Sequence, residues 1–175
     1  MARYRRFDTA RASAPGGGAV AEVPDPGPEL NDVRLRRAGL KAALSGLELA
    51  IARPGRGSEW TANVRDALEI LHEVWTRHIV ETEAPGAFLD ELVGESPRLA
   101  TPASRLRREH SEILAGIVRA EKKLTIIPID DDALDAHVEE LRDELTALLV
   151  ALARHRQRGA DLVYEAYQVD IGGGY

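Results

Sequence analysis

The chain contains no cysteine, which excludes disulfides, thiolate metal sites and cysteine nucleophiles. Aromatic residues are also scarce, at 5% of the 175 residues, and leucine and alanine dominate the apolar residues. Leucine and alanine favour helices, whereas β-sheet proteins are enriched in aromatic and β-branched residues. The composition therefore predicts an all-α protein.

Long hydrophobic runs are missing as well. No apolar stretch approaches the roughly 20 residues that span a membrane, and no signal-peptide hydrophobic region follows the first methionine. The formal net charge is −6, which is opposite in sign to the basic surface that nucleic acids select. We therefore predict a cytoplasmic protein that binds neither membranes nor nucleic acids.

Glycine and proline are frequent near the two ends of the chain. Residues 1–28 contain Ala14-Pro-Gly-Gly-Gly and Pro24-Asp-Pro-Gly-Pro, and residues 169–175 contain three consecutive glycines. Such segments bury too little apolar surface to offset their chain entropy. We predict a flexible tail over residues 1–28, removable without loss of the fold, a folded domain over 29–168 and a loose end over 169–175.

Apolar residues recur at helical spacing in four long segments, 29–52, 58–83, 101–124 and 132 to beyond 164, with a short helical turn at 87–93. Pro54-Gly55, Pro85-Gly86 and Ser96-Pro97 interrupt the pattern. Ser58 and Thr101 are the expected N-caps, with Pro102 in the first helical position after Thr101. The mostly short connections predict an antiparallel four-helix bundle with up-down-up-down topology.

Three of the predicted helices each carry one histidine where the apolar stripe calls for a hydrophobic residue, namely His78, His110 and His155. Three separately buried imidazoles would need three hydrogen-bond partners, each worth about 1 kcal/mol net. One shared metal ion would satisfy all three at once. We therefore predict that the histidines converge. His155 reaches their common level only if the last helix extends beyond its neighbour, or if the connection before it climbs.

The order of the motifs adds a family resemblance. His78-Ile-Val-Glu81-Thr-Glu83 is followed by Phe88-Leu89, Ser96-Pro97 and Glu109-His110. Over about residues 30–165 this order resembles hemerythrin-like proteins, the cation-binding four-helix domains. The resemblance implies a mono- or di-nuclear iron site, or one for manganese or zinc, that handles dioxygen, peroxide or nitric oxide or stores iron. The ligands it implies are the imidazoles of His78, His110 and His155. Oxygen ligands would come from Glu81 or Glu83, together with Asp161 or Glu165.

A metal-free bundle is the alternative interpretation. Arg37 stands where the resemblance leads us to expect a histidine on the first helix. A cation there repels a metal ion and would pair with leftover carboxylates such as Glu81 or Glu109. The histidines would then be polar core residues, and the function would lie in protein association or small-molecule binding. A homodimer is compatible with either interpretation.

Overall fold

The structure, a computed structural model, describes residues 28–126, 128 and 131–168, with side chains for 38–126, 128 and 132–166. Its elements are α1 (Pro28–Ala52), α2 (Ser58–Glu83), α3 (Phe88–Glu95), the 3₁₀ turn η1 (Pro97–Leu99), α4 (Ala100–Thr125) and α5 (Asp131–Gln168). The all-α prediction is confirmed, since the described residues contain no strand. Residues 1–27 of the predicted tail, residues 169–175 and the side chain of Arg37 lie outside this description, whereas Pro28, the last residue of the predicted tail, begins α1.

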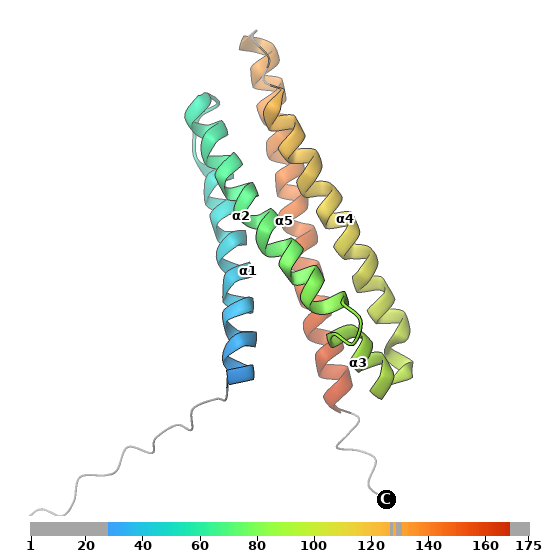
Figure 1. Cartoon of the computed structure of the whole chain (residues 1–175). Coiled ribbons are helices and arrows are strands. Elements are labelled where there is room, and N and C mark those ends of the chain that lie inside the picture. The colour runs from blue at the N-terminus through green and yellow to red at the C-terminus, as the bar shows by residue number, and fades with distance from the viewer. Residues whose placement is uncertain (1–27, 127, 129–130, 169–175) are drawn as a thin grey trace, which may run out of the picture.

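The four long helices lie side by side in Figure 1, where the colour runs up α1, down α2, up α4 and down α5. Packing is strongest between α1 and α2, between α4 and α5, and between α2 and α4. The short helix α3 lies at the lower end in Figure 1, beside the start of α4. Helices α2, α4 and α5 are thus neighbours around one interior.

Two apolar clusters fill that interior. The larger one contains the predicted stripe of α2, which is buried along its length, together with the matching faces of α1, α4 and α5. The smaller one closes the end of the molecule at α3 and consists of Leu89, Leu92, Leu99, Ala103, Leu106 and Leu162. On α4, His110 follows Leu106 of the small cluster and precedes Ile113 of the large one. His110 therefore lies between the two apolar clusters.

The two predicted N-caps, Ser58 and Thr101, are wrong, although α2 begins at Ser58 as predicted. Helix α2 is preceded by Gly57, and Ser58 is its first residue, without a side-chain capping bond. Helix α4 begins at Ala100, one residue before Thr101. The reason is that Pro97 starts a 3₁₀ turn that passes directly into α4, because Ala100 already has helical dihedral angles of φ −59° and ψ −40°. The backbone N–H of Ala100 donates to the carbonyl oxygen of Pro97 in this turn, and α4 has no side-chain capping bond.

Helix α5 extends beyond the end of α4. Lys123, two residues before α4 ends, pairs with Glu140 at 2.8 Å and with Glu144 at 2.6 Å. Residues 140–144 are therefore level with Lys123, and the first turns of α5 pass the end of its neighbour. Because α5 begins beyond the end of α4, His155 lies at the same height along the bundle as His110, which is one of the two arrangements that the sequence analysis allowed.

Hydrogen bonds from Arg142 of α5 hold the turn between α1 and α2. Gly55 adopts a φ of 123°, which only glycine accommodates readily. Arg142 donates hydrogen bonds to the carbonyl oxygens of Ile51, Arg53 and Gly55, the last at 2.7 Å. Its guanidinium also lies 4.6 Å from the ring centroid of Trp60. The end of α1 thus depends on a distant side chain.

We expect Arg142→Ala to lower the free energy of unfolding by about 2 kcal/mol, because carbonyl groups at a helix end lose charge-assisted hydrogen bonds. Urea denaturation at neutral pH measures this loss. The control is Arg77→Ala, which removes an exposed pair with Glu73 one turn away on α2. That pair is worth about 0.5 kcal/mol or less. Equal effects of the two substitutions would contradict the capping role of Arg142.

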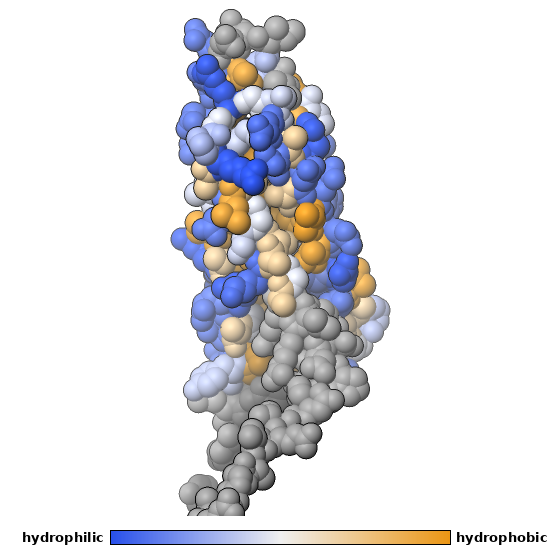
Figure 2. All heavy atoms as spheres, turned by 90° about the vertical axis from the view of Figure 1, so that its left-hand side faces the viewer, coloured by the Kyte–Doolittle hydropathy of each residue, from blue (hydrophilic) through white to orange (hydrophobic). Residues whose placement is uncertain are grey.

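The surface mixes hydrophilic and hydrophobic residues on the face shown in Figure 2. The large hydrophobic residues that stay exposed are spread over α1, α2, α3, α5 and the end of α4: Leu49, Ile70, Val80, Phe88, Ile126, Val150 and Tyr164. Within the described residues, every helix is too short or too polar to cross a lipid bilayer.

Candidate metal centre

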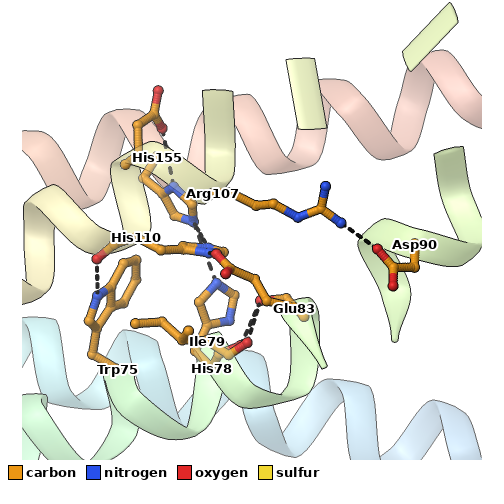
Figure 3. A network of polar contacts seen from close by, with 10 residues as sticks. Trp75, His78, Ile79, Glu83, Asp90, Arg107, His110 and His155 are labelled. Atoms are coloured by element: carbon orange, nitrogen blue, oxygen red, sulfur yellow. Dashed lines mark hydrogen bonds and ion pairs between the residues drawn. The ribbon is translucent and has the colours of Figure 1, made fainter. Parts of the chain in front are cut away.

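His78 from α2, His110 from α4 and His155 from α5 meet between the helices. Figure 3 shows the three rings pointing toward one another. The Nε2 atom of His155 lies 3.2 Å from that of His110 and 3.4 Å from that of His78. Ligand atoms from all three residues lie within 4.8 Å of one another, and this is the group in the described residues that could hold a metal ion. The predicted convergence is confirmed.

The spacing of the nitrogens matches a single ion. Zinc binds imidazole nitrogen at about 2.0–2.1 Å, and two such nitrogens at a tetrahedral angle are about 3.3–3.4 Å apart. The two Nε2–Nε2 distances of 3.2 and 3.4 Å agree with this value. A transition-metal ion of similar size therefore fits between His155 and each of the other two rings, and ligand atoms of all three residues lie within 4.8 Å of one another.

Carboxylates hold the outer nitrogens of two of the rings. The Nδ1 atom of His110 contacts Glu83 Oε1, and the Nδ1 atom of His155 lies 3.2 Å from Glu109 Oε2. An ionised carboxylate only accepts hydrogen bonds, so each ring carries its proton on Nδ1. The Nε2 lone pairs are thereby directed into the space between the rings. Metal-binding histidines have this same arrangement.

Glu109 is itself held on its other side. Its side chain is only 11% exposed and pairs with Arg158 Nε at 2.7 Å and with Arg105 Nε at 3.2 Å. Burial alone would raise the pKa of this carboxyl, but the bonds from Arg158 and His155 lower it below its usual value. Glu109 is therefore ionised at neutral pH and remains an acceptor for His155.

Trp75 covers one side of the histidine cluster. Its ring centroid lies 5.1 Å from that of His78, 5.5 Å from that of His110 and 5.1 Å from that of His155. The indole N–H donates to the backbone oxygen of His110 at 3.2 Å, and no part of the side chain is exposed. This packing fixes the rings and keeps water away from one side of the cluster.

The imidazoles are neutral at neutral pH. Burial, together with the neighbouring His110 and His155, lowers the pKa of His78 to about 4. Burial likewise lowers the pKa of His155 to about 4, with His110 contributing and Glu109 opposing. For His110 burial also lowers the pKa, against the opposing effect of Glu83. A neutral imidazole has a free lone pair, which is the form that binds metals.

The carboxylates of the predicted ligand set lie in different places. Glu83 is at the cluster, on the outer nitrogen of His110. Glu81 is half-buried on the same helix. Asp161 is exposed and accepts a hydrogen bond from Gln157 at 2.8 Å, while Glu165 is exposed and its backbone oxygen accepts from Arg98. The group within 4.8 Å contains none of these four carboxylates.

Glu109 is the site residue that sequence reasoning missed. A signal was present, because Glu109 follows Leu106 by three residues and precedes Ile113 by four, and so lies on the buried stripe of α4. The neighbouring His110 occupies the adjacent part of that stripe. A carboxylate in a buried position requires partners, and His155, Arg105 and Arg158 supply them.

Comparison with known proteins adds no assignment. No protein-family model matches the chain, and neither the curated proteins nor the solved structures contain a match. The resemblance to hemerythrin-like proteins thus stays a prediction based on the order of the motifs. The chemistry of the site has to be argued from its own residues.

Proposed function

We propose that this protein binds one divalent transition-metal ion through the Nε2 atoms of His78, His110 and His155. The observation that carries the proposal is the convergence of these atoms, with 3.2 and 3.4 Å between neighbours. The rings of His110 and His155 are held in the Nδ1–H form, so their lone pairs face each other across 3.2 Å. A shared cation would remove the repulsion between these lone pairs and form a metal–nitrogen bond with each of the three rings.

Three imidazoles leave at least one coordination position of such an ion for an outside ligand. An iron ion held by the three imidazoles would bind dioxygen, peroxide or nitric oxide at this open coordination position, as the hemerythrin-like resemblance implies. The site would lie in an antiparallel four-helix bundle with up-down-up-down topology, the architecture predicted from the short connections, and the alternating directions in Figure 1 support it. The role of this chain's own residues is to hold the ion, fix its ligands and exclude water on the Trp75 side.

Zinc is the second candidate metal. The specific observations in its favour are the near-tetrahedral spacing of His155 Nε2 from the other two nitrogens and the set of three imidazoles, which is a donor set of catalytic zinc sites. Manganese is less well matched, because it prefers oxygen ligands. With zinc, a water in the open position would become acidic and serve hydrolytic chemistry rather than gas binding.

Elemental analysis decides between the candidates. The protein is expressed in medium supplemented equally with iron, zinc and manganese, purified without chelators, and analysed for metal per chain. We expect about one ion per chain, with iron favoured by the family resemblance. Anaerobic addition of nitric oxide to the iron form should then change its visible absorption. A chain that carries no metal after both expression and reconstitution would refute the proposal and favour the metal-free alternative.

A further inference from the structure

We propose that Glu83 and Glu109 are positioning residues of the centre, each holding one histidine by its Nδ1–H so that Nε2 faces the ion. The inference rests on the proposed metal binding. It assigns to Glu83 a different role from the ligand that the family resemblance implied, and it gives a role to Glu109, which that resemblance left unassigned. Both carboxylates contact the ring nitrogen that points away from the cluster.

The two pairs are built alike although they come from different helices. Glu83 ends α2 and reaches His110 on α4, while Glu109 on α4 reaches His155 on α5. Each pair therefore joins two helices and fixes a ring at their interface. Helix α4 takes part in both pairs, with His110 as donor in one and Glu109 as acceptor in the other. The orientations of the two rings are thus linked through two adjacent residues of one helix.

The surroundings of the two carboxylates differ. Glu109 is 11% exposed and is held by Arg105 and Arg158, whereas the side chain of Glu83 is 27% exposed at the end of its helix. Arg105 and Arg158 reach solvent, with exposures of 59% and 33%. Removal of the Glu109 carboxylate leaves Arg105 in contact with water but takes the acceptor from the buried Nε atom of Arg158, so we expect Glu109→Ala to be less stable than the wild type, and its melting is measured to show that it folds.

The test measures Co²⁺ binding to the full chain by visible absorption and by competition with a chelator. We expect Glu83→Ala and Glu109→Ala to weaken Co²⁺ binding by about 10- to 100-fold, the usual effect of losing such a partner. Both should also alter the Co²⁺ absorption spectrum, because a released ring changes the ligand geometry. Glu83→Gln keeps an oxygen acceptor for His110 without the charge, and it should bind Co²⁺ more tightly than Glu83→Ala.

The chain offers a matched control in Glu121→Ala. His72 Nδ1 lies 2.8 Å from Glu121 Oε1, a pair of the same chemistry that also joins α2 to α4 but lies outside the cluster. Its loss should leave Co²⁺ affinity and spectrum unchanged. Melting of the metal-free variants provides the second readout, because a purely structural role would lower stability without altering the spectrum of the folded Co²⁺ form.

The outcomes separate the two proposals. A wild-type chain that binds neither Co²⁺ nor any of the metals tested above would overturn the metal site and this inference together. A wild type that binds Co²⁺, with Glu83→Ala and Glu109→Ala within twofold of its affinity and with its spectrum, would overturn the positioning roles alone. Equal weakening by Glu83→Gln and Glu83→Ala would show that charge acts there rather than the orientation of His110.

Discussion

Replacement of His110 or His155 by alanine is expected to abolish stoichiometric metal binding. Each ring supplies one of only three imidazole donors, and both are almost completely buried, with exposures of 2% and 4%. Removal of a donor leaves two imidazoles and a cavity lined by Trp75. The indole of Trp75 cannot bind a cation through a lone pair and so does not replace the lost nitrogen. We expect affinity to fall by at least about 100-fold, or nearly 3 kcal/mol. His78→Ala should have a similar effect, since its Nε2 completes the cluster.

Equilibrium dialysis against buffered Zn²⁺ or Fe²⁺ measures these affinities. His72→Ala and His137→Ala are the controls, because both residues pair elsewhere, His72 with Glu121 and His137 with the backbone oxygen of Lys123. Their affinities should equal that of the wild type. If one of the three cluster variants binds metal as tightly as the wild type, that residue is a polar core residue and the site needs another donor.

The metal-free protein is expected to lose stability steeply as the pH falls from about 6.5 to about 4. Folding lowers the pKa of both His78 and His155 from 6.5 to about 4, mainly through burial. Between these values the unfolded chain binds more protons than the native chain, so acid favours unfolding. A difference of about 2.5 pKa units corresponds to about 3 kcal/mol for the buried His155. The half-buried His78 contributes less, because solvent screens it.

Urea denaturation of chelator-treated protein at pH 7 and at pH 4.5 measures this loss. Metal-loaded protein at the same two pH values provides the comparison. Its free energy of unfolding should stay higher than that of the metal-free protein as the pH begins to fall below about 6.5, because bound imidazoles resist protonation until the ion leaves. A stability of the metal-free protein that stays flat between pH 6.5 and 4.5 would contradict the burial of neutral imidazoles.

The sequence alone determined the helices and most of their ends. The boundaries of α2 follow from Pro54-Gly55 before it and Pro85-Gly86 after it, since these pairs interrupt helical hydrogen bonding. The stripe from Trp60 to Trp75 is buried as its spacing predicted. Periodicity also placed His78, His110 and His155 on interior faces, because the side-chain direction repeats every 3.6 residues. These are local properties, and the local sequence is sufficient for them.

The tertiary structure decided what those residues contact. The position of His155 along the bundle depends on how far α5 extends beyond the end of α4. The ion pairs of Lys123 with Glu140 and Glu144 show this axial shift, and no local sequence pattern encodes it. The partners of Glu109 come from the same helix and from α5, so its role could not be predicted from spacing within α4. Asp161 and Glu165, close to His155 in sequence, instead face solvent on α5, because helical rotation carries them away from the stripe. Sequence periodicity fixes the face of each helix, whereas contacts between helices depend on their axial shift and rotation, which only packing determines.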